Sequence, residues 1–479
     1  MYRKRNRQQM AVEDFFLPFG GKLKADNRWV RTATLMPWDM IEDIYAATFK
    51  DENPDGRQPI SSRIAFGALY IKENENLTDE RTVENIAENN YMQYFLGLSE
   101  FSPEPLFDAS MMTWFRKRFN KDDISKINEE IYRRKNKSND DVDEPPAGYG
   151  DGKNKGTLIL DATVAPSDIR YPTDLSLLNE CRENTEKMID LIWDKTERKG
   201  HKTSYNRNIA RKRYLKVSKQ RKPRRNKIRQ AIGEQLDCVE KNLETLGGFL
   251  SKLDFESLSD WHWERLVTIC EVVRQQRWHY EDPKASIPNR IVNLRQPHVR
   301  PMVRGKAGRE IEFGQKIALS VVGGYTFIEE QGWNNFAEGV TLEASSEKYR
   351  KRHGVYPEAI LADMTYRNRN NLRFCKENGI RLSGPRLGRP KASELEADKE
   401  QAYWDNCERN MVEGRIGIVK RRYGLDRIYA RVDTAGEVEA AMNIICMNVA
   451  YMLRTFLRLI ICRLNTMLSG KNTVNFAGI

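Results

Sequence analysis

Two short apolar runs, far apart in the chain, each lead into an aspartate. Residues 158–160 precede Asp161, and residues 359–362 precede Asp363. Fully apolar runs of this length are typical of buried central strands, so we predict that each aspartate ends a strand and that the two meet at one edge of a sheet. Paired carboxylates without nearby His or Cys suit hard divalent cations such as Mg²⁺ or Mn²⁺, and two such ions can promote in-line attack on a phosphate. The alternative is that both aspartates are ordinary turn residues.

A third carboxylate, Glu413, lies in a segment with two faces at helical spacing. The apolar face consists of Val412, Ile416, Val419 and Tyr423, which predicts that the helix packs on the sheet. A neighbouring stripe carries Arg409, Glu413 and Lys420. A carboxylate between two cations could complete a metal site while the cations hold phosphates. The alternative is a surface salt bridge between Arg409 and Glu413.

The composition indicates a globular chain with an anionic partner. At 479 residues, 39% hydrophobic and 31% charged, the chain is long enough for two or three domains. Lys and Arg number 80 against 68 Asp and Glu, a net charge of +12, which favours nucleic acid as the partner. The seven cysteines form no CxxC pair, which argues against a zinc ribbon or a disulfide framework and for a reducing cytosol. No apolar signal core follows the basic N-terminus, and the apolar stretch 440–462 contains Asn and Arg, which indicates a buried helix instead of a membrane span.

The pattern along the chain predicts an α/β protein with helical additions. We expect helices in residues 1–133, a polar linker at 134–156, an α/β domain at 157–465 and a tail at 466–479. Within the α/β domain, Gly323 and Gly324 join two β-rich runs, which predicts a tight hairpin. We expect residues 300–309 to form a basic loop before that hairpin. Residues 175–300 show helical periodicity, and we expect Trp261, Trp263 and Trp278 in their core.

The most basic part of the chain lies within residues 195–229. A solvated helix normally carries both signs of charge, and this run contains almost no acids. We predict that it follows a phosphate backbone, with the residues most directly involved being Arg221, Lys222, Arg224 and Arg225. The alternative is a solvated face with no ligand.

Three pieces of the sequence resemble the DDE transposases of bacterial insertion sequences. They are 160–163 with 171–174, then 362–366, and finally Arg409-x3-Glu413-x6-Lys420. The last piece matches the family's Y-x2-R-x3-E-x6-K signature except that Asn406 replaces its tyrosine. The resemblance covers most of residues 35–460.

This resemblance implies an RNase H-like mixed sheet flanked by helices, an all-α N-terminal DNA-binding domain and a large basic helical insertion after the first strand, at about 175–300. Asp161, Asp363 and Glu413 would be the catalytic, metal-binding acids, with two Mg²⁺ (or Mn²⁺) ions per site. The rivals Asp168 and Asp174 end no apolar strand, and Glu408 lies one residue off the charged stripe.

The same resemblance implies a reaction and partners. Water would cut DNA at the element's ends, and the resulting 3′-hydroxyl would attack target DNA. Arg409 and Lys420 would contact phosphates, and Trp333 would stack on an unpaired base unless it packs locally. We expect a homodimer on paired terminal inverted repeats, in the bacterial cytoplasm at the nucleoid. Two alternatives remain, namely a catalytically inactive DNA-binding descendant and an RNase H-like nuclease without strand transfer.

Overall fold

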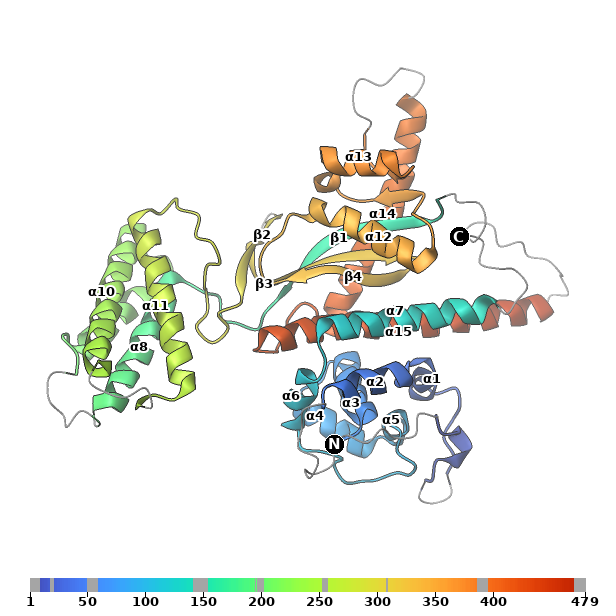
Figure 1. Ribbon diagram of the computed structural model, residues 1–479, viewed down its shortest axis with the longest axis horizontal. Helices are drawn as coiled ribbons and strands as arrows, with labels where there is room; N and C mark the ends of the chain where they lie inside the picture. The colour runs from blue at the N-terminus through green and yellow to red at the C-terminus, as the bar shows by residue number, and fades with distance from the viewer. Residues whose placement is uncertain are drawn as a thin grey trace.

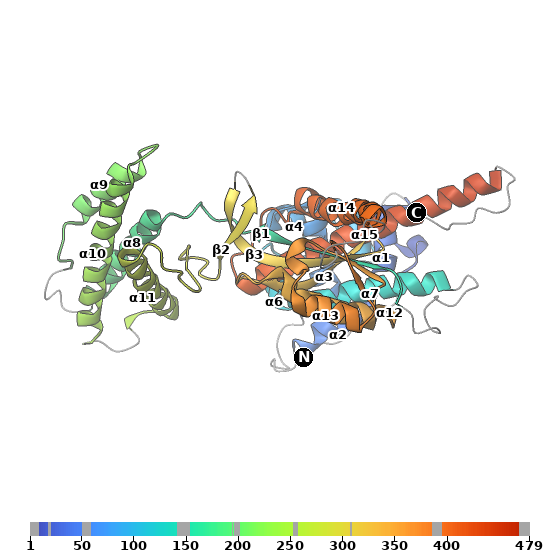
Figure 2. The same cartoon turned by 90° about the horizontal axis from the view of Figure 1, so that it is seen from above.

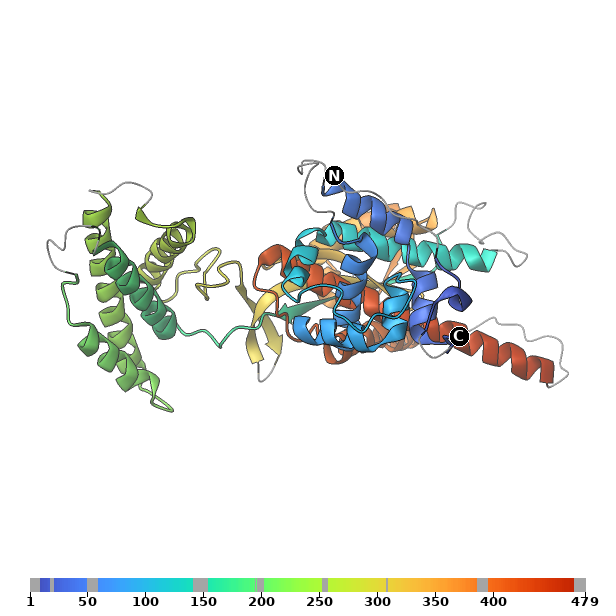
Figure 3. The same ribbon diagram turned by 90° about the horizontal axis from the view of Figure 1, so that it is seen from below.

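The computed structural model describes residues 9–17, 21–49, 59–140, 154–193, 195, 202–251, 257–306, 309–385 and 395–468. A curled mixed sheet with helices on both faces forms the centre (Figure 1). A bundle of N-terminal helices lies on one side of this centre, and a separate helical unit projects from one end (Figure 3). The predicted combination of a mixed α/β sheet with many helices is therefore confirmed.

The sheet has six strands: β1 Thr157–Pro166, β2 Arg300–Lys306, β3 Arg309–Val322, β4 Tyr325–Gly332, β5 Ala359–Leu361 and β6 Arg381–Leu382. The strand order is β2-β3-β1-β5-β6, and β4 also pairs with β3. β1 runs antiparallel to β3 and parallel to β5. β3 and β4 are joined by Gly323 and Gly324, whose φ angles of 54° and 83° suit a two-residue hairpin. The predicted hairpin is confirmed.

The prediction of a loop at residues 300–309 is wrong. Residues 300–306 form β2, which pairs with the first half of β3. The first half of β3 alternates polar and apolar residues, and the two strands expose Val303 and Ile311. β2 has only the short apolar run 301–303 between basic residues and a glycine, so the segment resembled a loop in the sequence.

The two faces of the sheet pack against different helices (Figure 2). α12 (Leu342–His353) and α13 (Arg369–Glu377) cover the face that carries Leu158 and Leu160. α14 (Leu395–Tyr423) packs on the opposite face, where Val412 contacts Ile159. Alternate residues of a strand point to opposite faces, so Asp161 shares the α14 face with Ile159.

Two long helices lie side by side between the sheet and the N-terminal bundle (Figure 1). They are α7 (Lys121–Asp140) and α15 (Asp433–Leu468). The bundle consists of α1 Arg28–Leu35, α2 Trp38–Ala47, α3 Ser62–Glu75, α4 Asp79–Glu88, α5 Asn90–Phe95 and α6 Met111–Lys117. Asn448 of α15 donates to Asn128 Oδ1 of α7 (2.9 Å) and to Thr326 O of β4 (2.7 Å), so a buried amide joins both helices to the sheet.

The N-terminal helices share one hydrophobic core with α15. The predicted boundary at 133/134 falls inside α7, which continues through Asp140 because no Gly or Pro interrupts those polar residues. Residues 141–153 of the predicted linker and 469–479 of the predicted tail lie outside the described residues, and α15 extends past the expected boundary at 465. None of the described helices combines the length and hydrophobicity needed to cross a bilayer.

The projecting helical unit comes between β1 and β2 in the chain and has its own core. Its helices are α8 Asp174–Trp193, α9 Arg207–Ser218, α10 Arg225–Leu250 and α11 Asp260–Glu281. The expectation that three tryptophans lie in this core is wrong for Trp261 (53% exposed) and Trp278 (40% exposed), whereas Trp263 packs partly against it. The buried residues of α11 are aliphatic residues such as Ile269 and Val272, together with Gln275 and Gln276.

The close approach of β3 to β1 makes a prediction about Gly314. A Cβ at this position would lie 2.1 Å from Ala165 O, a backbone atom that cannot rotate away. We expect Gly314→Ala to lower the free energy of unfolding by about 3 kcal/mol, measured by thermal denaturation. The control is Gly247→Ala in α10, where a Cβ meets no atom within 4 Å. That variant should be about 0.5–1 kcal/mol more stable than the wild type, and equal stability of the two variants would contradict the strand pairing.

Candidate active site

The parallel pairing of β1 with β5 brings the segments that carry two predicted acids to the same end of the sheet. Thr157 lies opposite Ala359, an offset of 359 − 157 = 202 residues. Asp161 and Asp363 have the same offset, 363 − 161 = 202, so both come two residues after the last paired position, Ile159 with Leu361. The expectation that Asp161 ends its strand is wrong, because β1 continues to Pro166 against β3. Asp161 instead lies where the parallel half of its pairing stops.

Asp161 is the more buried of the two aspartates. Its Oδ1 atom accepts a hydrogen bond from the backbone N–H of Ala162 (2.8 Å). Burial raises the pKa of the Asp161 carboxyl, the Ala162 N–H lowers it, and the charges of Glu338 and Glu413 raise it while Arg409 lowers it. Carboxylates from separate elements therefore act on one another at this end of the sheet.

Asp363 caps the short 3₁₀ helix η6 (Met364–Tyr366). Its Oδ1 atom accepts a hydrogen bond from Met364 N (2.7 Å), so the first turn after β5 fixes the side chain. The side chain is 53% exposed, and solvent or a ligand can reach it.

Helix α14 brings the third acid to the same place. Val412, Val419 and Tyr423 are buried and Ile416 is partly buried, which confirms the predicted apolar face. Because Val412 packs on β1 and β5, the adjacent Glu413 is held beside the ends of those strands. Lys420 is half-buried on the same helix, about 10 Å further along its axis than Glu413.

Arg409 bridges two of the three acids. Its guanidinium lies 3.6 Å from Asp363 Oδ1 and 4.0 Å from Glu413 Oε1. The salt bridge between Arg409 and Glu413, which was the alternative explanation of the charged stripe, is therefore present. The same guanidinium also reaches Asp363. Ion pairs this long between partly exposed groups contribute about 0–1 kcal/mol each, so Arg409 can exchange the carboxylates for another anion at little cost.

The donor chemistry fits a hard divalent cation, because Asp161, Asp363 and Glu413 offer only carboxylate oxygens. Among the described residues, however, no three acidic, His or Cys side chains lie close enough together to hold a metal ion. The positive charge beside these acids comes from Arg409. A metal site would form here by displacement of that guanidinium.

The rival acids have other partners. Asp168 pairs with Arg427 (2.5 Å), which joins two loops, and Asp174 pairs with Arg290 (2.6 Å), which joins a loop to the start of α8. Glu408 is exposed on α14.

The predicted DNA-contacting residues outside the acid cluster lie in two places. Trp333 packs on His298, with ring centroids 4.3 Å apart, and against Gly436 of α15. Packing on His298 and Gly436 is enough to explain the position of the Trp333 ring, so its stacking on a DNA base stays a prediction. Four exposed or half-exposed cations surround the turn between α9 and α10: Arg221, Lys222, Arg224 and Arg225.

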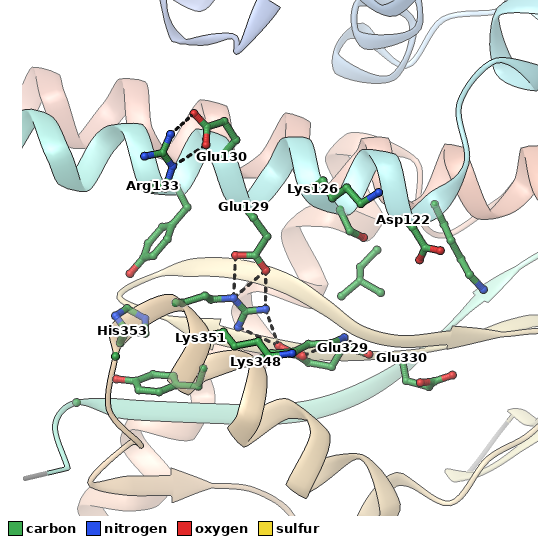
Figure 4. Close-up of a pocket in the computed structure, with 18 of the residues that line it drawn as sticks. Asp122, Lys126, Glu129, Glu130, Arg133, Glu329, Glu330, Lys348, Lys351 and His353 are labelled. Carbon is green, nitrogen blue, oxygen red and sulfur yellow. Dashed lines mark hydrogen bonds and ion pairs between the residues drawn. The ribbon is translucent and has the colours of Figure 1, made fainter. Parts of the chain in front are cut away.

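A cavity of about 1400 Å³ lies away from the acids, between α7, β4 and α12 (Figure 4). Its charged side chains largely neutralise one another. Arg352 pairs with Glu129 (2.7 Å) and Glu329 (3.2 Å), and Arg133 pairs with Glu130 (2.7 Å). None of the predicted site residues lines this cavity, and its paired charges indicate a role in joining α7 to the sheet.

Two family models match the chain. The model described as "Transposase DDE domain" matches residues 360–450, which include Asp363 and Glu413, and the model described as "Transposase domain (DUF772)" matches residues 18–118. The chain belongs to the DDE transposases of insertion sequences. Asp161 lies outside both matched ranges. Neither family model therefore bears on the role of Asp161 in this transposase.

One relative shares part of the sequence of this transposase. The relative, from Rhizobium meliloti, carries the name "Uncharacterized protein ORF8 in nfe locus". It is 30% identical over 148 residues, which make up 31% of this chain and 66% of that protein. No solved structure matches the chain.

The burial of Asp161 makes a prediction about stability and pH. A carboxyl whose pKa is higher in the folded than in the unfolded state binds its proton more tightly when folded, so its ionisation destabilises the fold. Asp161→Asn should therefore be about 1 kcal/mol more stable than the wild type at pH 7.5. The gain should shrink as the pH falls through the pKa of Asp161, because the wild-type carboxyl then becomes neutral too.

The control for this measurement is Asp363→Asn, whose exposed side chain caps η6 and pairs with Arg409. That variant should show no gain. Thermal unfolding between pH 4 and pH 8 checks both variants, and an Asp161→Asn protein less stable than the wild type at pH 7.5 would contradict the buried placement of this carboxylate.

Proposed function

We propose that this transposase cuts DNA at the ends of its element and joins the cut ends to target DNA. The reaction would take place in an RNase H-like catalytic domain made of the six-stranded sheet, α12, α13 and α14. The helical unit α8–α11 is then an insertion in that domain, and the N-terminal helices bind the element's ends. The observation that supports the proposal is the pairing of Arg409 with both Asp363 and Glu413, near enough to Asp161 that the charges of Arg409 and Glu413 shift the pKa of its carboxyl.

In this proposal Asp161, Asp363 and Glu413 would together hold two divalent cations. When bound, the ions would polarise the scissile phosphate and lower the pKa of a water molecule. The register of β1 with β5 gives the two aspartates a fixed spacing, and the packing of Val412 fixes the approach of Glu413.

In the proposed reaction Arg409 first binds acidic side chains and later binds a DNA phosphate. Before DNA binds, it balances the charge of Asp363 and Glu413. When the phosphate backbone arrives, the guanidinium moves to a non-bridging phosphate oxygen, for which its planar donors are well suited. Asp363 and Glu413 would then be free to hold the metal ions. Lys420, further along α14, would bind the next phosphates.

DNA outside the reacting phosphates is held by the helical unit and by a second copy of the chain. The cations at the α9–α10 turn would follow the backbone of the end or target duplex. Two ends must be joined in one event, so we propose a homodimer with one chain on each terminal inverted repeat, acting at the bacterial nucleoid.

The direct test of the catalytic role is Asp363→Asn. With purified protein, Mg²⁺ and a labelled fragment of the element's end, the variant should cleave at least about 100-fold more slowly than the wild type, because a neutral amide binds Mg²⁺ poorly. Glu408→Gln, which changes an exposed acid on α14, is the matched control and should cleave normally.

The same assay separates the alternative functions. Undiminished cleavage by Asp363→Asn would remove the catalytic assignment. A wild-type protein that binds the end fragment but never cuts it in Mg²⁺ or Mn²⁺ would be an inactive DNA-binding descendant. Cleavage without joined products, when target DNA is supplied, would identify a nuclease that does not transfer strands.

The basic turn between α9 and α10 makes a separate prediction. Replacement of Arg221, Lys222, Arg224 and Arg225 by Gln should weaken DNA binding and flatten its dependence on salt, by about 0.9 in the log–log slope for each phosphate that the variant no longer neutralises. The control is Lys187→Gln with Lys241→Gln, two exposed cations elsewhere on α8 and α10. Fluorescence anisotropy over a salt series measures both proteins, and an unchanged slope in the fourfold variant would show that the turn faces bulk solvent.

A further inference from the structure

Three segments that are far apart in the chain meet at the end of the sheet nearest the helical unit α8–α11 (Figure 1). Backbone hydrogen bonds join them. Ser167 N donates to Phe313 O of β3 (2.9 Å), and Asp168 N donates to Ile428 O (2.8 Å). Residues 166–168 thus lie between β3 and the loop that joins α14 to α15.

Large side chains at this end of the sheet are exposed to solvent. Tyr171 is 69% exposed and Tyr429 is 53% exposed. The Tyr171 ring lies edge-on to Phe313, with ring centroids 5.5 Å apart. Val303 and Ile311 form the next cross-strand pair on the same face of the β2–β3 ribbon as Phe313, and both are exposed. The two tyrosines therefore belong to a surface on which several large apolar side chains contact water.

The backbone of Tyr429 is fixed although its ring is exposed. Glu439 of α15 is buried, and its carboxylate accepts hydrogen bonds from Tyr429 N (3.0 Å) and Ala430 N (2.9 Å). Ile428, directly before the tyrosine, is fully buried and forms a β-bridge with Ser167. A ring held on such a backbone loses little conformational freedom when a partner covers it. Exposed aromatic rings in fixed positions are typical of binding surfaces.

The same segments carry an excess of positive charge. Residues 167–173, 298–306, 309–313 and 424–432 contain seven Lys or Arg and four Asp or Glu, a net charge of +3. The Arg427 guanidinium lies 5.5 Å from the centre of the Tyr429 ring. Aromatic rings beside cations suit a partner that is both flat and anionic, as the nucleotides of a DNA strand are. A second copy of the chain would bring the same positive charge, so repulsion disfavours self-association through this surface.

The surface also continues the line of predicted DNA contacts. From Arg409, α14 runs past Lys420 to its end at Tyr423, about 20 Å away, and the loop that carries Tyr429 follows directly. In the other direction, the chain leads from Tyr171 into α8 of the helical unit. A strand bound at Arg409 would therefore pass the two tyrosines on its way to that unit.

On the basis of the proposed action on DNA, we propose that Tyr171 and Tyr429 stack on unpaired bases of a DNA strand, while the neighbouring cations attract its phosphates. Stacking uses the faces of the bases and does not depend on their sequence. The partner is single-stranded DNA, because the bases of an intact duplex already stack on one another.

The test is the binding of a fluorescently labelled single-stranded oligonucleotide to the full-length protein in EDTA, measured by anisotropy. Tyr171→Ala and Tyr429→Ala should each raise the Kd about 10-fold. Tyr171→Phe and Tyr429→Phe keep the rings and should bind as the wild type does. The control is Trp404→Ala, which removes an exposed ring of α14 outside this surface and should leave the Kd unchanged. Thermal unfolding checks that each variant is folded.

An abasic form of the oligonucleotide separates stacking from charge, because it keeps every phosphate. The wild type should bind the abasic strand more weakly than the normal strand. The double variant Tyr171→Ala with Tyr429→Ala should bind the two strands alike.

Three results would overturn the inference. The double variant could bind the normal strand as tightly as the wild type does. It could distinguish the normal from the abasic strand as strongly as the wild type does, which would place the stacking elsewhere. It could bind the strand normally and change the sedimentation of the DNA-free protein, which would make the surface an interface between copies of the chain. Because EDTA removes divalent metal, failure of the cleavage assays would remove the proposed reaction and leave these binding results unchanged.

Discussion

The hydrogen-bonded register between β1 and β5 is the constraint on which the rest of the site depends. The two strands share only three paired positions, yet these fix the offset that sets Asp161 against Asp363. A slip of one residue would turn one of the aspartates to the other face of the sheet. The long antiparallel pairing of β1 with β3 prevents such a slip, because it continues on both sides of Asp161. The pairing of strands that are far apart in the sequence therefore brings the segments that carry the two carboxylates to the same end of the sheet.

The cost of burying the Asp161 carboxylate and the repulsion between neighbouring acids must be offset, and Arg409 offsets part of both. Acidic side chains from several elements converge here, and burial makes the ionised form of Asp161 costly. The guanidinium between Asp363 and Glu413 offsets part of the repulsion without the strong geometry of a buried ion pair. The packing of the helices behind the sheet stabilises the fold instead. α15 shares its core with the N-terminal helices, and Asn448 ties it to α7 and β4.

Much of this arrangement could be predicted from the sequence. Apolar runs located the central strands, the Gly323–Gly324 pair located the hairpin, and helical spacing identified the face of α14 that packs on the sheet. The sequence was less informative where structure depends on distant partners. The β2 strand has only a short apolar run, residues 301–303, and the end of α7 is polar. The register of Asp161 with Asp363 likewise requires knowledge of which strands pair.

The central claim is that acids far apart in the sequence bind divalent metal together. Anomalous diffraction from crystals of the full chain soaked in Mn²⁺ measures this directly. We predict an anomalous peak within bonding distance of carboxylate oxygens from both Asp161 and Asp363. Manganese bound only elsewhere on the protein, with Arg409 still bridging Asp363 and Glu413, would contradict this claim.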